Sequence, residues 1–363
     1  MFLDKIPKSA AVNECVNLCK KYGYKSASFV NAILRKVEKS DYDELKNISD
    51  DFERISKMYS MPEWIARKLI DQYDIGGAEE ICKNSNIRPK VTIRVNRLKT
   101  TVQEFENMLN ECNIEYEVSK IENFLHLKNV KNVSGLELFQ QGYFTVQDEG
   151  AGEIGRVLNP KQGENVLDAC SAPGGKTTHL AEIMNNEGCI EAWDIHEHRI
   201  KLVEENAKRL GINIIKTKTK NAFEYIEEYE QKFDKILLDV PCMGIGVLKR
   251  KPDIKWQKEQ KDIPEITEVQ ENILKTCLGY LKIGGELVYS TCSILKEENE
   301  DIISRVIDFK SIEENQKNAS GIRDFKNMEE NGKEKCFEVL KQKTILPDIN
   351  TDGFFICKIK RIR

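Results

Sequence analysis

The sequence predicts an α/β fold built on a parallel sheet that helices cover on both faces. After residue 164, apolar runs alternate with segments of helical periodicity, and most of these runs are continuously apolar. Strands buried on both faces carry such continuous runs, and alternation of strands with helices is typical of parallel sheets. Ligands bind these sheets at the carboxyl ends of the strands, so functional residues are expected at that edge.

The expected elements of this sheet follow one another at short intervals. The strands are NVLDAC, CIEAWDI, INIIK, FDKILLDV and GELVYSTCS. The helices that alternate with them are expected near residues 174–186, 196–210, 221–230 and 265–282. Residues 309–340 are polar and rich in Asn and Lys, which predicts a surface insertion or a long loop.

Two smaller regions precede the sheet. Residues 8–60 carry apolar side chains at i, i+3, i+4 spacing and are predicted to be helical, and MPEWIARKLIDQYD begins a further helix with Pro62 in its first turn. A small α+β module is expected next, from a β-rich run at 90–100, a helix near 101–111 and short strands near 114–118, 124–127 and 143–146. The expected domains are therefore 1–60, 61–146 and 147–363.

The composition excludes several classes of protein. With 363 residues, 40% hydrophobic and 32% charged, the chain is typical of globular proteins. No apolar run approaches the ~20 residues of a membrane helix, and the start, MFLDKIPKSAAV, lacks the features of a secretory signal. We therefore expect a cytoplasmic monomer with no membrane partner. The 11 cysteines are scattered and form no C-x-x-C pair, so neither a disulfide framework nor a metal site is predicted.

A glycine loop, LDACSAPGGKTTHL, joins the first strand to its helix. Such a turn lets a ligand approach the backbone and the helix N-terminus closely. The letters GGKT resemble the end of a triphosphate-binding P-loop, but that pattern requires glycine where this chain has Cys170. The dinucleotide fingerprint G-x-G-x-x-G is absent as well. Neither phosphate-binding pattern is satisfied.

The second strand ends at Asp194, eighteen residues after Lys176. An acid at this position commonly holds ribose hydroxyls, although Asp194 could instead cap the helix that follows. A glycine loop and a ribose-binding acid without a phosphate cradle indicate a nucleoside cofactor that carries no phosphate. The combination favours S-adenosylmethionine.

Two cysteines follow two strand ends. Asp239-Val240-Pro241-Cys242 ends the fourth strand, and Thr291-Cys292 ends the fifth. Because these strands are expected to be neighbours, both thiols should face the cofactor crevice. A thiol there suits methylation of a pyrimidine at C5, since adding a thiolate to C6 makes C5 nucleophilic. Asp239 could hydrogen-bond the ring and stabilise the charge that develops.

Three long motifs carry a family resemblance: DACSAPGGKTTHLAE, LLDVPCMGIGVLKRKPDIKW and LVYSTCSILKEENE. They resemble the RNA cytosine-5 methyltransferases of the Sun (Fmu) family, and the similarity spans roughly residues 5–363. The resemblance implies S-adenosylmethionine-dependent C5-methylation of a cytosine in 16S ribosomal RNA through a covalent Cys–C6 adduct. It also implies a Rossmann-like methyltransferase domain at 147–363, an RNA-binding α+β module at 61–146 and a partial NusB-like helical RNA-binding segment at 1–60.

The resemblance also assigns residues. It implies Cys292 as the nucleophile, Cys242 as the thiol that assists product release, and Lys176 as a group that orients Asp239. The cofactor contacts it implies are Cys170, Ser171, Ala172, Pro173, Gly174, Gly175, Lys176, Asp194, Asn221 and Asp239.

The chain departs from the family pattern at three places. Asn221 stands where Asp is usual, which should alter or weaken adenine binding, and Ser171 stands where Ala is common. The helical segment 1–60 matches only the second half of a NusB-like domain. We therefore expect either a truncated chain or a reduced contribution of this segment to RNA affinity.

Two basic stretches are the candidate RNA contacts. In RVNR and KRKPDIKW, the charged side chains Arg94, Arg97, Lys249, Arg250 and Lys251 are predicted to hold phosphate. Trp256 could stack on a base or serve packing. The target cytosine must leave its stack to reach Cys292, as bases do in enzymes that modify them.

Two other functions stay open at this point. The first is a P-loop ATPase with Lys176 on phosphate and Asp239 on magnesium, although Cys170 argues against it. The second is an RNA-binding scaffold without activity, suggested by the short helical segment and by Asn221.

Overall fold

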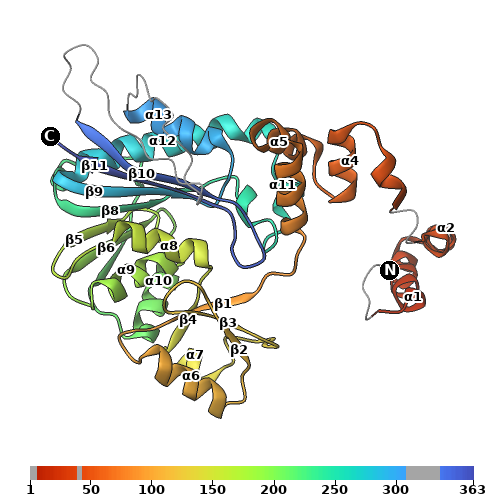
Figure 1. The fold of residues 1–363 in the computed structure, drawn as a ribbon, viewed down its shortest axis with the longest axis horizontal. Helices are drawn as coiled ribbons and strands as arrows, with labels where there is room; N and C mark the ends of the chain where they lie inside the picture. Colours follow the sequence, from red (N-terminus) through yellow and green to blue (C-terminus); the bar gives the residue numbers. More distant parts are fainter. Residues whose placement is uncertain (1–5, 39–42, 308–335) are drawn as a thin grey trace. The chain divides into compact units, whose positions relative to one another are not determined.

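The computed structural model describes residues 6–38, 43–307 and 336–363. The chain divides into two compact units, Met1–Glu79 and Glu80–Arg363 (Figure 1). The second unit contains both sheets, so the two units do not coincide with the three domains expected from the sequence. None of the helices in the described ranges is long and apolar enough to cross a membrane.

The first unit is helical, as predicted. It contains α1 (Lys8–Cys19), α2 (Tyr24–Lys36) and α4 (Asp51–Met58), and the long helix α5 (Glu63–Ser85) begins in it. Gly23 separates α1 from α2 with φ +116°, a conformation that L side chains rarely adopt. The Asp50 side chain caps α4 by accepting from the Glu53 N–H. Within α5, Asp74 has a non-helical backbone, so two helical stretches meet there at a kink.

The α+β module forms as predicted in the second unit. Its antiparallel sheet has the order β2-β3-β1-β4, and its elements are β1 (Val91–Val95), α6 (Val102–Glu111), β2 (Tyr116–Val118), β3 (Phe124–Leu127), α7 (Glu137–Gln140) and β4 (Phe144–Val146). Thr101 and Glu104 form a reciprocal capping box that begins α6. Phe105 and Leu109 of α6 are fully buried against Ile93, Val95 and Phe144 of the sheet, so the module has its own core.

The large sheet has seven strands in the order β10-β11-β9-β8-β5-β6-β7. Its parallel part consists of β5 (Asn165–Asp168), β6 (Cys189–Asp194), β7 (Ile215–Thr219), β8 (Phe233–Asp239) and β9 (Leu281–Thr291). Four of them match the predicted apolar runs, whereas β7 overlaps the run INIIK only at Ile215 and Lys216 and continues to Thr219. As predicted, β8 and β9 are neighbours, and Asp239 pairs in register with Ser290.

Helices cover both faces of this sheet (Figure 1). The helices of one face are α8 (Glu149–Leu158), α9 (Gly175–Ile183) and α10 (Glu197–Leu210), and those of the other are α12 (Ile263–Tyr280) and α13 (Glu300–Ile307). The short α11 (Ile254–Gln257) precedes α12. Each face has its own buried core, and Trp193 with Tyr229 and Tyr280 forms the aromatic centre of the second one.

One sequence prediction about the sheet region is wrong, and a second is contradicted only at its C-terminal end. Residues 221–230 form only a 3-10 turn, Glu227–Tyr229, because Tyr229 is buried against Trp193 and the Ile226 N–H bonds the Tyr280 hydroxyl. The predicted long loop at 309–340 includes the start of β10 (Phe337–Ile345), and residues 309–335 lie outside the described ranges. β10 and β11 (Phe354–Arg361) extend the sheet antiparallel beyond β9, and the sequence reading did not anticipate them.

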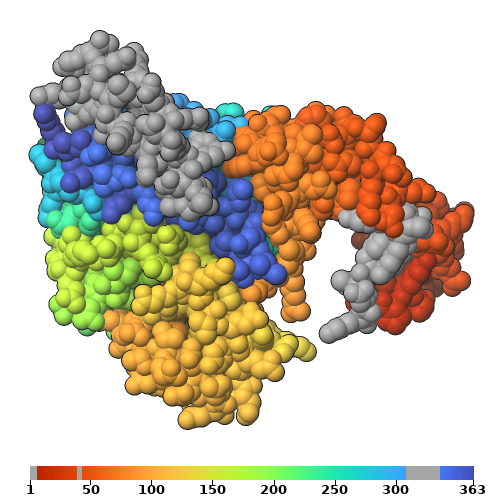
Figure 2. All heavy atoms as spheres, viewed as in Figure 1, coloured from red at the N-terminus to blue at the C-terminus, as the bar shows by residue number. Residues whose placement is uncertain are grey.

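The module and the large sheet are joined by specific polar contacts. Asn96 at the end of β1 donates to the carbonyls of Gly142 and Leu210, and Arg209 of α10 donates to the carbonyl of Phe144. In Figure 2 the yellow atoms of the module adjoin the green atoms of the sheet region. The second unit is therefore one continuous body around the edge where the strands β5 and β8 end.

Candidate active site

The glycine loop between β5 and α9 is fixed in place by close packing. Gly174 has φ +100°, and a Cβ there would lie 3.1 Å from the Cα of Val203, so conformation and space both require glycine. Gly175, in contrast, has open space where a Cβ would stand. The backbone at the start of α9 is therefore open to a ligand.

Hydrogen bonds from β6 and α10 hold the same loop. The N–H and the hydroxyl of Ser171 both donate to the Trp193 carbonyl, at 2.7 and 2.9 Å. Arg199 donates to the Ala172 carbonyl, and Asn206 donates to the Pro173 carbonyl. The loop conformation is thus set by neighbouring elements before any ligand binds.

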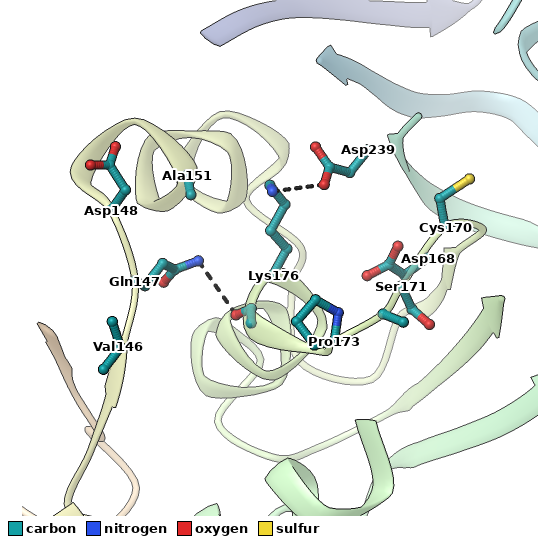
Figure 3. A pocket seen from close by; sticks show the side chains of 12 residues that line it. Val146, Gln147, Asp148, Ala151, Asp168, Cys170, Ser171, Pro173, Lys176 and Asp239 are labelled. Carbon is teal, nitrogen blue, oxygen red and sulfur yellow. Dashed lines mark hydrogen bonds and ion pairs between the residues drawn. The ribbon is translucent and has the colours of Figure 1, made fainter. Parts of the chain in front are cut away.

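A pocket of about 200 Å³ lies against this loop (Figure 3). Seven of the ten predicted cofactor-binding residues line it: Cys170, Ser171, Ala172, Pro173, Gly175, Lys176 and Asp239. Gly174 supports the loop from behind, as its contact with Val203 shows. The other walls come from Asp168 of β5 and from Gln147 and Asp148 ahead of α8.

Lys176 and Asp239 form an ion pair on the wall of this pocket (Figure 3). The Nζ–Oδ2 distance is 2.7 Å, and the other oxygen of Asp239 accepts from the Ser290 hydroxyl at 3.1 Å. Burial disfavours the charge on Lys176, but the attraction and hydrogen bond of Asp239 outweigh burial and raise the pKa of Lys176. Lys176 therefore stays cationic and fixes the direction of the Asp239 carboxylate.

Asp168 is the unexpected member of the pocket. Its Oδ2 accepts from the Thr177 hydroxyl at 2.7 Å, whereas its buried Oδ1 has no hydrogen-bond partner. Burial, with the nearby charge of Asp239, raises the pKa of Asp168 to about 7, although the bond from Thr177 opposes the shift. A buried acceptor that is unsatisfied in a pocket is suited to a ligand that brings a donor.

Asp194 and Asn221 lie near each other but outside the lining of this pocket. Asp194 ends β6, is only 4% exposed, accepts from the His196 N–H and forms an ion pair with Arg199. The Lys220 N–H donates to the Asp194 carbonyl at 3.0 Å, which brings Asn221 to the same strand edge. The Asn221 side chain accepts from the Phe223 N–H. Asp194 thus bonds the residue before α10 without being its N-cap, which is His196.

The two predicted thiols are in contact. The Sγ atoms of Cys242 and Cys292 are 3.0 Å apart, and both side chains are partly exposed. Their hydrogen bond and burial raise the pKa of the Cys242 thiol, and the charges of Glu298 and Asp239 add to this shift. Cys292 in turn contributes to the raised pKa of Lys176. The thiol pair therefore lies close to the Lys176–Asp239 pair.

Arg94 does not present its charge to RNA. Its guanidinium is 1% exposed and pairs with Glu182 of α9 at 2.7 Å. The remaining donors bond Gln147, the Gly175 carbonyl and the Thr178 hydroxyl. The predicted phosphate contact at Arg94 is replaced by a buried bridge between the module and α9.

Lys249 and Arg250 are also engaged internally. Lys249, with its side chain 1% exposed, bonds the carbonyls of Asp348 and Thr351 and lies 3.4 Å from Asp352. Arg250 pairs with Asp352 and with Asp148. These contacts replace the predicted phosphate contacts at both residues.

Arg97, Lys251 and Trp256 are exposed, so the sequence prediction for them remains compatible with the structure.

The sequence reading missed three residues that shape the site. Asp168 stands inside the quoted glycine-loop motif, two residues before Cys170, and its position at a strand end was the available signal. Gln147 connects the pocket wall to the Gly175 carbonyl. Glu298 lies in the acidic run after Cys292, a run that the sequence alone marks only as charged.

The parallel sheet, the glycine loop without a phosphate-binding pattern and the acidic strand ends define a Rossmann-like methyltransferase domain. The family model described as 16S rRNA methyltransferase RsmB/F matches residues 155–360, and the chain belongs to this family. A ferredoxin-like domain of the same proteins matches residues 61–134, and the NusB family matches residues 1–39.

Individual relatives agree with this assignment. A probable ribosomal RNA small subunit methyltransferase B of Bacillus subtilis is 38% identical over 99% of this chain and 80% of its own length. The corresponding protein of Synechocystis is 36% identical over 84% of this chain and 70% of its own length. A crystal structure of a methyltransferase homologue from Pyrococcus horikoshii is similar with a TM-score of 0.68 and 29% identity, and covers 86% of this chain and 100% of that chain.

Proposed function

We propose that this protein transfers a methyl group from S-adenosylmethionine to C5 of a cytosine in 16S ribosomal RNA, through a transient bond between Cys292 and C6 of the base. The observation that carries the proposal is the pair of thiols, 3.0 Å apart, beside the Lys176–Asp239 ion pair at the glycine-loop edge of the sheet. Family membership supports the reaction class and the RNA substrate.

The pocket residues fit the proposed cofactor. The unpartnered Oδ1 of Asp168 suits the α-ammonium group of the methionine moiety, and the open backbone at Gly175 leaves room for that moiety. Asp194 would hold the ribose hydroxyls and Asn221 the adenine amine, since both stand at the adjoining strand ends. When bound, S-adenosylmethionine supplies an electrophilic methyl group on its sulfonium.

The chemistry requires one thiol to attack and the other to carry a proton. The thiolate of Cys292 adds to C6 and forms an S–C bond, and the electron pair of the C5–C6 double bond makes C5 nucleophilic. After C5 has been methylated, solvent water takes the C5 proton, and the C–H electron pair re-forms the C5–C6 double bond. The S–C bond then breaks with its own electron pair on Cys292, to which the thiol of Cys242 can donate a proton. A raised pKa keeps Cys242 protonated, which suits a group that assists release rather than one that attacks.

Asp239 and Lys176 serve the base in this scheme. Asp239 would accept a hydrogen bond from the exocyclic amine of the cytosine and would share a proton with N3, which stabilises the negative charge that develops on the ring on addition. Lys176, 2.7 Å from Asp239, holds the carboxylate in the direction of the pocket. The RNA backbone would contact the exposed Arg97 and Lys251, while Trp256, 68% exposed, is available for stacking. One chain supplies both thiols and the loop, so a monomer suffices.

The two thiols can be separated by mutation. Labelled methyl transfer into unmethylated 16S RNA is expected to disappear in Cys292→Ala, with no covalent RNA–protein complex on denaturing gels. Cys242→Ala is expected to accumulate that complex, because release is slowed. Bisulfite mapping of the product RNA should locate 5-methylcytosine. Cys112→Ala, at an exposed cysteine outside the pocket, is the control.

Two results would contradict the proposal. Retained methylation in Cys292→Ala would remove Cys292 as the nucleophile. Methyl label on a base nitrogen or a ribose oxygen in the wild-type product would show that no carbon is methylated, and the need for a thiol would vanish.

A further inference from the structure

A buried carboxylate, Glu298, lies between the two loops that carry the thiols. We propose that Glu298 is a positioning residue that fixes the loops of Cys242 and Cys292 relative to each other, so that attack and release occur from one preset geometry. This inference rests on the proposed function and adds a residue that touches neither substrate nor cofactor pocket. It concerns a side chain that the glycine loop and its pocket do not include.

The first set of contacts secures the Cys242 loop. Oε2 of Glu298 accepts from the Met243 N–H at 2.8 Å and from Nε2 of Gln270 at 3.0 Å. The same Gln270 nitrogen donates to the Pro241 carbonyl at 2.9 Å. The residues on both sides of Cys242 are thus tied, directly or through Gln270, to one carboxylate oxygen.

The second set secures the Cys292 loop. The hydroxyl of Ser293 donates to Oε1 of Glu298, so the residue after Cys292 is tied to the other carboxylate oxygen. The neighbouring Asn299 accepts from the Thr291 hydroxyl at 2.6 Å and donates to the Ser293 carbonyl at 3.0 Å. The residues on both sides of Cys292 are therefore held as well, and Glu298 is the member that spans both loops.

The chemistry of these contacts indicates more than packing. Glu298 is fully buried, and the partners named above are neutral: a backbone N–H, an amide and a hydroxyl. Burial raises the pKa of Glu298, although the hydrogen bonds oppose the shift. Burying a carboxylate without a cation is unfavourable, and an apolar side chain would fill the space at lower cost. Hydrogen bonds to a carboxylate are shorter and stronger than neutral ones, which is an advantage where a fixed separation is needed.

A backbone hydrogen bond also connects the two thiol loops. The Gly246 N–H donates to the Cys292 carbonyl at 2.9 Å, and a Cβ at Gly246 would lie 2.8 Å from that carbonyl oxygen. This bond fixes the Cys292 backbone to residues 244–247. The Glu298 side chain instead fixes the residues that flank each thiol, so the two sets of contacts act on different parts of the loops.

The contacts make different predictions for the two steps of the reaction. Besides Glu298, Gln270 bonds the Cys242 loop and not the Cys292 loop, whereas Ser293 belongs to the Cys292 loop. Gln270→Met should therefore slow release and accumulate the covalent complex. Ser293→Ala should slow formation of the complex. Glu298→Ala should slow both steps, with kcat falling about 10²-fold, as a displacement of about 1 Å can cause.

Single-turnover kinetics with 16S RNA would resolve the two steps, together with the KM for S-adenosylmethionine and thermal unfolding of each variant. The KM should stay near the wild-type value, because none of the three side chains lines the pocket. Glu298→Gln keeps an acceptor oxygen and should recover most of the rate. Glu300→Gln is the matched control, since Glu300 is a partly buried carboxylate of the same acidic run that accepts from the Thr344 hydroxyl instead of from the thiol loops.

The outcomes separate the two proposals. A wild-type protein that forms neither 5-methylcytosine nor a covalent complex would overturn the proposed function, and the inference would fall with it. An active wild type with unchanged rates in Glu298→Ala, or with the same loss in all variants including Glu300→Gln, would overturn the inference alone. If Glu298→Ala does not fold, opposite effects of Gln270→Met and Ser293→Ala on the complex decide the question, and equal effects would refute it.

Discussion

Two ion pairs of the second unit have the same separation and different surroundings. Lys176–Asp239 and Arg94–Glu182 both have a shortest N–O distance of 2.7 Å, and both involve a residue predicted to act on ligand or RNA. The side chains of the first pair are 17% and 28% exposed and face a pocket, whereas those of the second are 1% and 4% exposed. The first pair keeps acceptor capacity for a ligand.

The two pairs differ in how many N–H donors of the cation remain available to a ligand. The guanidinium of Arg94 bonds Glu182, Gln147, the Gly175 carbonyl and Thr178, all inside the protein. The ammonium group of Lys176, in contrast, donates a hydrogen bond to Asp239 and lines the pocket. The type of residue and its proximity to a motif therefore do not identify a functional charge. A functional charge is identified instead by the hydrogen bonds that the charged group can still make at a surface.

Breaking the buried Arg94–Glu182 pair should have the largest effect on stability. Arg94→Met leaves Glu182 buried without its cation, and the free energy of unfolding is expected to fall by about 3–5 kcal/mol. Urea denaturation followed by circular dichroism measures this change. Arg97→Ala, at an exposed cation three residues away, should change stability by less than about 0.5 kcal/mol.

A double variant sharpens the same comparison. Arg94→Met with Glu182→Leu removes both charges, so most of the lost stability should return. If the double variant were as unstable as Arg94→Met, the loss would come from packing at the module junction and not from an unpaired charge.

Breaking the Lys176–Asp239 pair at the pocket should affect activity more than stability. Lys176→Met releases the Asp239 carboxylate, and methyl transfer should fall on the order of 10²-fold because a preorganised group is lost. The pair is partly exposed, so the stability change should stay below about 1 kcal/mol. Methyl-transfer kinetics and thermal unfolding on the same samples test both parts. A fully active Lys176→Met would mean that Asp239 needs no orientation.

A further prediction concerns the pH dependence of stability. The pKa of Asp168 rises from 3.8 to about 7 on folding, so between these values the folded protein holds a proton that the unfolded chain has released. Stability should therefore fall as pH rises through this window, by at most about 1.4 kcal/mol per pH unit, and level off above it.

Asp168→Asn tests this slope. Urea denaturation of wild type and variant at about pH 5, 6 and 7 should show a weaker decline in the variant, because Asn does not titrate. Parallel curves for the two proteins would show that Asp168 is ionised throughout the window.

Local sequence was sufficient for the sheet centre and the glycine loop. The apolar runs predicted β5, β6, β8 and β9, since a strand buried on both faces needs a continuous apolar run. The edge strand β7 has no buried residue and overlaps its predicted run only at Ile215 and Lys216. The apolar residues Phe223, Ile226 and Tyr229 have helical spacing, which favoured a helix at 221–230. The structure has no such helix there, and Tyr229 packs against Trp193 in the core. In β11 and β10, lysines interrupt the apolar pattern, and Lys358 pairs across strands with Glu286.

Long-range partners explain what the sequence did not predict at the site. Glu182 is 88 residues from Arg94, and Asp352 is 102 residues from Arg250. Met243 is 55 residues from Glu298. A basic run next to a motif gives no indication of such partners, whereas the thiols were predictable because each directly follows a strand end.

The interior position of β11 has a consequence for synthesis of the protein. β11 pairs with β9 up to Thr291, and the Gly353 N–H just before it bonds the Gly246 carbonyl. Chains emerge from the ribosome N-terminal end first. The support beneath Cys292 is thus translated only after β9 itself, and a nascent chain cannot complete its crevice until residues 353–361 have emerged from the ribosome.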